Sequence, residues 1–380
     1  MRRQNRIQFR RSQHLVCYWS RERFVIQDYS TGVRVSLDPI ACRILNFFDK
    51  WRPLEALFES MGSFSRASLR AAVFQLARHS LLERSDYPRK HNRQAMQGWE
   101  SWHPAAGFFH FSTKDVSYTI DPVEERKYFR RRARQWPTPE PIKCYPAAPK
   151  FRLPLIPTDS ELPQILLARR TWRQFSSEPI QLSSLGILMW LTWGVQRWMR
   201  VPVLGRLALK TSPSGGARHP VEVYVLALRV GGLPRGLYHY RADKHQLELL
   251  RKGANPDWVT RFLQGQAWFK SAAALMLMTA VFARTQWKYR SPRAYRAVLL
   301  ETGHLCQTFC LLATWLRLAP FCTLALNDSE VERYLGIDGV SESVIYAAGV
   351  GSRPAEAEPI LHSGSNSRSA TSLRKFVFAF

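Results

Sequence analysis

The sequence predicts an α+β protein, a mixed β-sheet with flanking helices, preceded by a small winged-helix-like domain. Apolar runs rich in β-branched residues are typical of buried strands, and they occur at 221–228, 273–282 and 344–351. Two long apolar segments are typical of core helices, one over 182–198 and one from 294 to 317. A hairpin pattern followed by three helical patterns indicates that residues 1–90 form the small domain.

Length and charge limit the classes of function. The chain has 380 residues, a hydrophobic fraction of 46% and 13 tryptophans, which is enough for two packed domains and argues against global disorder. The net charge of +26 indicates an acidic ligand or partner, such as a nucleic acid, a lipid surface, a phosphate cofactor or an acidic peptide. Because the basic residues are spread along the chain, they do not indicate one dedicated nucleic-acid arm.

The chain has six cysteines, which are Cys17, Cys42, Cys144, Cys306, Cys310 and Cys322. None of them form a C-x-x-C pair. Cys306 and Cys310 lie one helical turn apart, but no pair of histidines accompanies them. We therefore expect reduced, mostly buried thiols in a cytoplasmic protein, and no metal site. The charged N-terminus has no apolar core typical of a signal peptide, and the apolar run 272–283 is too short to span a bilayer.

The small domain leaves two kinds of partner open. Residues 24–37 carry its strand pattern. Its three helices are expected to begin at Asp38-Pro39, Pro53 and Ser65. Winged helices often bind DNA, and the third helix carries Arg66, Arg70 and Arg78. The same fold can also bind a peptide as an added strand at its sheet edge.

Residues 91–149 form a connector between the two domains. It begins with an aromatic stretch, continues with a basic helical piece and ends in an extended proline-rich stretch, 136–141. The second domain is predicted over 150–355, and a serine-rich tail follows at 356–380. In the long helix of that domain, we expect Glu301 to lie outside the buried stripe.

A cluster of arginines follows the first helix of the second domain. Arg169, Arg170 and Arg173 stand close together, and Thr171 adds a hydroxyl group. Like charges this close repel one another unless an anion lies among them, and arginine can bind phosphate oxygens two at a time. The segment therefore indicates a phosphate site, although a solvated basic turn would also explain it in so basic a chain.

A glycine-containing loop precedes the first buried strand. It begins with Pro213, Ser214, Gly215 and Gly216 and ends at Pro220. Glycine lets backbone N–H groups approach a flat or anionic ligand that a Cβ atom would exclude, and a serine hydroxyl can donate to the same ligand. The loop is a candidate binding site, although prolines and glycines also mark ordinary surface turns.

Four motifs in a fixed order carry a family resemblance. They are Arg-Arg-Thr-x-Arg-x-Phe, Ser-Pro-Ser-Gly-Gly-Ala-Arg-His-Pro-x-Glu-x-Tyr, Gly-Leu-Tyr-His-Tyr and Glu-x-Gly-His-x-x-Gln. Together they resemble the nitroreductase-like flavoproteins, and within these the SagB-type dehydrogenases, also called McbC-like thiazole/oxazole oxidases. The resemblance covers about residues 150–353. It implies a nitroreductase-like α+β fold and a homodimer with FMN in each of two interface sites.

The resemblance also implies roles for individual residues. Arg169, Arg170, Thr171 and Arg173 match the phosphate- and ribityl-binding motif, Pro213 to Gly216 match the loop against the flavin ring, and Arg353 matches a second phosphate contact. Lys288 and Tyr289 match the catalytic Lys-Tyr signature of the family. The N-terminal domain resembles peptide-recognition domains that gather leader peptides.

The implied activity is the oxidation of thiazoline or oxazoline rings in a ribosomally made precursor peptide, as in bacteriocin biosynthesis. A hydride would pass to the flavin, a proton would pass to Lys288 oriented by Tyr289, and oxygen would reoxidise the flavin. A YcaO-type cyclodehydratase is the implied partner enzyme. Two alternatives stay open: a general nitro or quinone reductase using NAD(P)H, and a basic winged-helix nucleic-acid-binding protein with a degenerate flavin fold, although nucleic acid is not the partner we expect.

Two departures from the family pattern bear on the site. Thr171 stands where the family usually has serine, and this change keeps the hydroxyl group. The segment from Leu316 to Pro320 lacks the glycines of the usual Leu-Gly-Leu-Gly pattern, because Arg317 and Ala319 occupy their places. If that loop lies near the flavin, we expect an altered pocket.

Overall fold

The computed structural model describes residues 7–36, 39–87, 93–117, 121–136, 139–143, 146–147, 149–153, 160–202 and 204–355. Asp38, Cys144, part of the proline-rich stretch and the tail 356–380 lie outside the described residues. The chain divides into two compact units. The N-terminal unit comprises 1–114, 281–299 and 338–342, and the sheet unit comprises 115–280, 300–337 and 343–380.

The N-terminal unit is a small fold of strands and helices, as predicted. Its strands are β1 (Gln8–Arg11), β2 (Leu15–Ser20), β3 (Arg23–Asp28), β4 (Val33–Ser36), β5 (Arg52–Pro53) and β6 (Leu82–Arg84). They pair in two sheets, in the orders β5-β1-β6 and β2-β3-β4. The helices are α1 (Pro39–Phe47), α2 (Leu54–Ser60), α3 (Arg66–Arg78), α4 (Arg93–Glu100) and α5 (His103–Ser112). The Ser65 hydroxyl caps α3 by accepting from the Ser68 N–H at 3.1 Å, as expected for this residue type.

An aromatic cluster joins α4 and α5 to two later segments of the same unit, α10 (Phe282–Lys288) and the start of α11 (Ala294–Trp315). His110 stacks on Trp99 with 4.8 Å between the ring centroids, and its Nδ1 lies 2.9 Å from the hydroxyl of Tyr295. Burial lowers the pKa of His110 to about 3, so this imidazole is neutral. The aromatic stretch of the connector is therefore helical and packed within the N-terminal unit.

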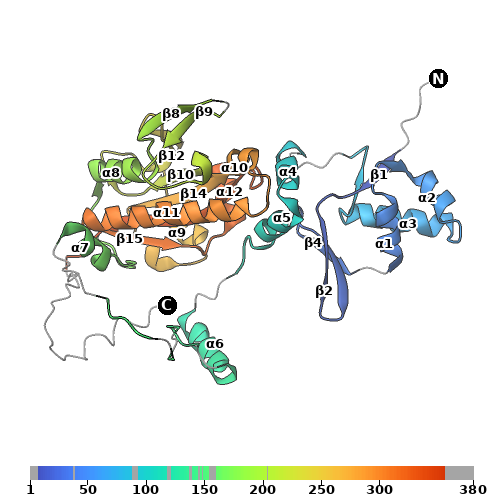
Figure 1. Ribbon diagram of the computed structural model, residues 1–380, viewed down its shortest axis with the longest axis horizontal. Helices are drawn as coiled ribbons and strands as arrows, with labels where there is room; N and C mark the ends of the chain where they lie inside the picture. The colour runs from blue at the N-terminus through green and yellow to red at the C-terminus, as the bar shows by residue number, and fades with distance from the viewer. Residues whose placement is uncertain are drawn as a thin grey trace. The chain divides into compact units, whose positions relative to one another are not determined.

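The sheet unit is built on six strands in the order β13-β12-β10-β14-β16-β15. Their bounds are β10 (Val221–Ala227), β12 (Gly236–Arg241), β13 (Gln246–Lys252), β14 (Ala274–Val281), β15 (Leu318–Thr323) and β16 (Glu342–Ser352). Alternate residues face opposite sides, because side chains alternate along a strand. Val223 and Val225 pack with α8 (Leu182–Trp193) and α11, while Tyr224 and Leu226 pack with α9 (Asp257–Phe262) and α12 (Asp328–Leu335). The sheet thus lies between two helical layers (Figure 1).

The predicted helix 182–198 is too long, and α8 ends at Trp193. The Gly194 N–H turns back to the carbonyl groups of Met189 and Trp190, and a Cβ at position 194 would lie 2.4 Å from the Trp190 carbonyl oxygen. The chain then forms an antiparallel pair, β8 (Arg197–Val201) and β9 (Gly205–Leu209). The apolar composition continued past the glycine and concealed this helix end.

The remaining elements are α6 (Pro122–Gln135), α7 (Glu161–Ala168), β7 (Ile180–Gln181), β11 (Val230–Gly231) and two short 3₁₀ turns, Gly215–Ala217 and Ala267–Phe269. Among the described residues, α11 is the one helix with the length and apolar composition of a membrane span, and half of its most apolar window is buried inside the fold. Leu305 and Phe309 are part of the core beneath it, as for the central helix of a globular unit.

Candidate functional site

The arginine segment lies along the β15 edge of the sheet. It begins where α7 ends, with the Arg169 N–H bonded to the carbonyl of Ile165. The Trp172 N–H donates to the Pro320 carbonyl of β15 at 2.9 Å, and the Ser176 N–H donates to the Ser352 carbonyl of β16 at 2.9 Å. These bonds fix Arg170, Thr171 and Arg173 beside β15 and the C-terminal end of β16.

Positive charge gathers around the indole of Trp172. The guanidinium carbons of Arg170 and Arg353 lie 4.6 Å and 5.4 Å from the ring centroid. Arg353 also donates to the carbonyls of Leu318 and Thr314, at 3.0 Å and 3.1 Å. Burial, and then the charges of Arg170 and Arg317, lower the pKa of Arg353. The structure thus places Arg353 with the arginine segment, at the C-terminal end of α11.

Arg317 belongs to the same group of charges, and its backbone is unusual. Its φ is 56°, in the left-handed region that favours glycine. This conformation costs a non-glycine residue about 1–2 kcal/mol. Although the usual glycine is missing from this position, the backbone keeps the glycine-like turn and adds a guanidinium group there.

The glycine loop is a tight turn with several left-handed residues. Gly216, Ala217 and His219 have φ values of 63°, 53° and 42°. The Ser214 hydroxyl accepts from the His219 N–H at 2.9 Å, so the oxygen that we expected to meet a ligand also braces the loop. Pro213 and Gly215 are exposed, and Gly216 is partly buried.

The loop is fastened to the middle of α11. The hydroxyl groups of Ser212 and Thr308 lie 2.9 Å apart, and His219 Nδ1 lies 3.4 Å from a carboxylate oxygen of Glu301. Glu301 is only 3% exposed, so the expectation that it lies outside the buried stripe was wrong. A buried carboxylate requires a partner, and its partner lies far away in the sequence, on the loop. No local pattern could have revealed that pair.

The two predicted binding segments contact different parts of α11 within one chain. The loop is fastened at Glu301 and Thr308, whereas Arg353 bonds to Thr314. At 1.5 Å of rise per residue, Thr314 lies roughly 9–20 Å along the axis from those two positions. A ligand that meets both segments of one chain must therefore be elongated.

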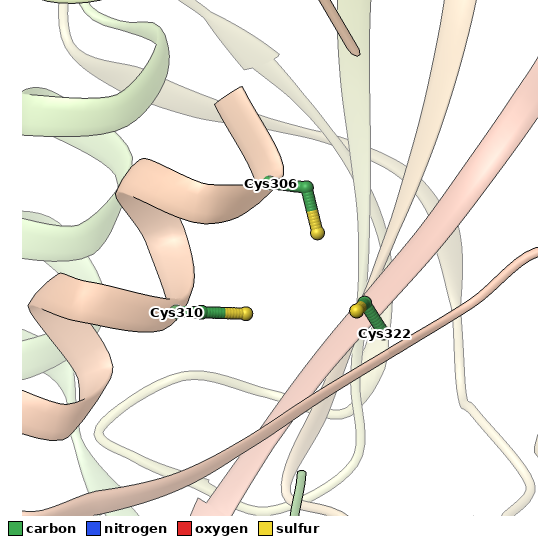
Figure 2. Close-up of side chains that lie close together, drawn as sticks. All are labelled: Cys306, Cys310 and Cys322. Atoms are coloured by element: carbon green, nitrogen blue, oxygen red, sulfur yellow. The ribbon is translucent and has the colours of Figure 1, made fainter. Parts of the chain in front are cut away.

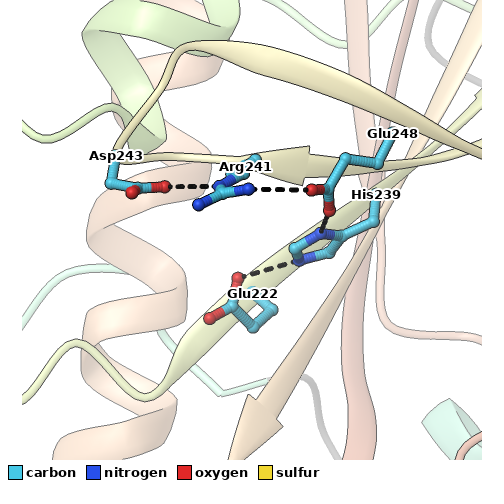
Figure 3. A network of polar contacts seen from close by, with 5 residues as sticks. All are labelled: Glu222, His239, Arg241, Asp243 and Glu248. Atoms are coloured by element: carbon cyan, nitrogen blue, oxygen red, sulfur yellow. Dashed lines mark hydrogen bonds and ion pairs between the residues drawn. The ribbon is translucent and has the colours of Figure 1, made fainter.

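His239 of the Gly-Leu-Tyr-His-Tyr motif belongs to a polar network on the neighbouring strands β10, β12 and β13 (Figure 3). His239 lies between Glu222 and Glu248, with N···O distances of 3.2 Å and 3.0 Å. Arg241 continues the network to Asp243 at 3.0 Å. The hydrogen bond with Glu222, and then the one with Glu248, raises the pKa of His239. The motif therefore holds three strands in register.

Lys288 and Tyr289 stand at the C-terminal end of α10. The Lys288 Nζ atom lies 5.4 Å from the ring centroid of Tyr289, and the Tyr289 carbonyl accepts from Trp102 Nε1 at 2.7 Å. Both residues belong to the N-terminal unit, whereas the arginine segment and the glycine loop belong to the sheet unit. Their catalytic role stays a prediction.

Sequence reasoning missed a cluster of three thiols. The helical spacing of Cys306 and Cys310 was evident, but Cys322, on the strand that follows α11, points at the same place (Figure 2). Hydrogen bonds from Cys306 and Cys310 lower the pKa of Cys322. The short connection between α11 and β15 is the signal that could have indicated this cluster, because it makes β15 run back alongside α11.

Comparison with known proteins agrees with this architecture. Residues 166–352 match the nitroreductase family. The Methanocaldococcus jannaschii protein MJ1384, named as a nitroreductase, is 29% identical over 178 residues, which are 47% of this chain and 85% of MJ1384. Two proteins of Rhizobium leguminosarum bv. trifolii are also similar. Trifolitoxin-processing protein TfxB is 31% identical over 36% of this chain and 38% of its own length, and trifolitoxin operon protein TfxC is 23% identical over 63% and 68%.

The matched range contains the arginine segment, the glycine loop and the six-stranded sheet. The resemblance inferred from the four motifs is thus confirmed at the level of the family. Residues 166–352 form a domain of the nitroreductase family, whose members are flavin-binding oxidoreductases.

Proposed function

We propose that this protein is an FMN-dependent dehydrogenase of the SagB type, which oxidises azoline rings of a ribosomally made precursor peptide to azoles. The observation that carries the proposal is the position of Arg170 and Arg353 over the ring of Trp172, next to the family's phosphate motif, with the charge of Arg317 acting on Arg353. The names of TfxB and TfxC connect two relatives with trifolitoxin, and this supports a role in processing a product of that kind.

The residues present fit FMN. Burial, and then the charges of Arg170 and Arg317, lower the pKa of Arg353, and a phosphate dianion among the three guanidinium groups would offset that repulsion. Arg169, Arg173 and the Thr171 hydroxyl would complete the phosphate and ribityl contacts. The left-handed turn at Gly216 would bring backbone close to a flat ring.

We further propose that the protein acts as a homodimer. In this arrangement the glycine loop of one chain and the arginine segment of its partner would close on one FMN. The separation of the two segments along α11 supports this arrangement, since each chain would contribute one half of each site.

In the proposed reaction, FMN supplies the hydride acceptor when it is bound. Lys288 accepts the proton that leaves the ring carbon of the azoline. Tyr289 helps to hold the lysine in place, with its ring centroid 5.4 Å from the Lys288 Nζ atom. One C–H bond is lost as a hydride and another as a proton, which leaves the aromatic azole.

The N-terminal unit is the proposed site for the leader part of the peptide. Its β2-β3-β4 sheet has β2 and β4 as outer strands, and an extended peptide can add to such an edge. We place the reaction in the cytoplasm, beside a YcaO-type cyclodehydratase that makes the azoline.

Replacing Lys288 with alanine tests the catalytic assignment. We expect K288A to bind FMN as the parent does, because the lysine is not among the proposed cofactor contacts, and to lose at least 100-fold in azoline oxidation (a general base typically supplies about 10²–10⁴-fold). Peptide mass loss of two hydrogens per ring, followed with time, measures the rate. The neighbouring exposed cation gives a matched control, R290A, which should keep the rate. Unchanged turnover by K288A would refute the role of the lysine.

A general nitro or quinone reductase is the second candidate, favoured by the similarity to MJ1384. Rapid oxidation of NAD(P)H with small quinones, together with no reaction on azoline peptides, would establish that function instead. Colourless protein with salt-sensitive DNA binding would favour the nucleic-acid alternative, because phosphate contacts weaken as salt rises.

A further inference from the structure

Three thiols meet in the core of the sheet unit, where α11 lies against β15 (Figure 2). Their Sγ atoms all lie within 4.8 Å of one another. Cys306 and Cys310 come from successive turns of α11 and are 4% and 5% exposed, and Cys322 comes from β15 and is partly buried. All three are free cysteines.

Burial alone does not account for this arrangement. A buried cysteine usually packs as a small apolar side chain among other apolar groups. Here each sulfur instead faces two other sulfurs from a different turn or strand (Figure 2). Cys322 and Tyr346 are both partly buried and pack against the apolar core that contains Cys306 and Cys310. The cluster is thus a set of three soft donors held together inside the fold.

The spacing suits a metal bound to three sulfurs. With metal–sulfur bonds of about 2.3 Å, three sulfurs around a trigonal ion lie about 4 Å apart. The present separations, all within 4.8 Å, are compatible with this value. Soft thiolates select Cu(I) and zinc, but structural zinc requires a fourth ligand. In the part of the chain that the structure describes, no histidine, aspartate, glutamate or further cysteine joins the group.

We propose that Cys306, Cys310 and Cys322 bind one monovalent copper ion in a trigonal three-sulfur site. This proposal replaces the expectation of a chain without a metal site. Binding displaces the thiol protons and forms three Cu–S bonds without any change of oxidation state. The ion would fasten α11 to β15 beside the arginine segment, and its binding does not depend on the proposed enzymatic activity.

Competition with a chromophoric Cu(I) chelator tests the site on the full-length, reduced protein without oxygen. We expect one copper per chain after desalting, and three sulfur neighbours around it by X-ray absorption spectroscopy. C322A should lose the bound copper. C17A removes an exposed cysteine of β2 and should keep it. Copper should also raise the Tm of the parent and of C17A but not of C322A, because a ligand stabilises only the fold that binds it.

Far-ultraviolet circular dichroism and the variant C306A guard against a folding defect in C322A. Loss of copper by both variants with a native spectrum would support the site. No retention of copper by the reduced parent, or equal retention by C322A, would overturn it. A preference for zinc held by three sulfurs and one oxygen would overturn the assignment to copper.

Discussion

The two predicted binding segments contact α11 in different ways, the arginine segment near its C-terminal end and the glycine loop near its middle. At the end, Arg170 and Arg353 lie over the ring of Trp172 and the charge of Arg317 acts on Arg353, so this candidate site consists of charge. In the middle, the glycine loop is fastened by Glu301 and a hydroxyl pair, so the site consists of backbone shape. A charged site tolerates changes of shape but not of charge, and a shaped site has the opposite tolerance. We propose that this difference separates recognition of a phosphate from recognition of a flat ring.

The largest effect is expected from adding a side chain to the glycine loop. Gly216 has a φ of 63°, and a non-glycine residue there costs about 1–2 kcal/mol, with a β-branched residue at or above the upper value. G216V should therefore lower the free energy of unfolding by about 2 kcal/mol and abolish flavin binding, because its Cβ would occupy the space of the ring. Urea unfolding and flavin titration measure the two effects.

The matched control is G62V, at a glycine that has no positive φ and whose Cβ would meet only one backbone oxygen, at 4.0 Å. It should leave flavin binding unchanged. Flavin bound by G216V with the parent affinity would show that the ring lies elsewhere. It would refute the assignment of the glycine loop to the flavin ring.

A smaller effect is expected at Arg317, where charge and backbone strain occur in one residue. R317A removes the guanidinium and keeps the strain of the left-handed backbone, whereas R317G removes both the guanidinium and the strain. The two variants should lose the same amount of FMN affinity, but R317G should be more stable than R317A by about 1 kcal/mol. Thermal unfolding and FMN titration of the pair separate the contributions. Equal stability of R317A and R317G would show that the turn carries no strain.

The parts of the fold that depend on local sequence were predictable. The run 221–228 became β10, and 344–351 became most of β16, because a buried strand is a continuous apolar segment and needs no distant partner to be recognised. The arginine segment and the glycine loop could be picked out as candidate binding segments for a similar reason, since each is a short motif with its own chemistry, and their binding roles stay predictions.

Features that depend on distant partners were not predictable. Glu301 is buried because His219 reaches it from a loop, and Cys322 joins Cys306 because β15 turns back along α11. The end of α8 depends on how the chain packs at Gly194, while the apolar composition continues unchanged. In each case the sequence shows one member of a contact and gives no sign of the other.

The central claim is that the arginine cluster binds the phosphate of FMN, and the ratio of FMN to riboflavin affinity tests it most directly. We predict that the full-length protein binds FMN at least tenfold more tightly than riboflavin, about 1.4 kcal/mol, since riboflavin lacks only the phosphate. R170A should bring the ratio close to one and leave riboflavin affinity unchanged, while R197A, which removes an exposed arginine of β8, should keep it. Equal affinities in the parent, or a ratio unaffected by R170A, would contradict the account.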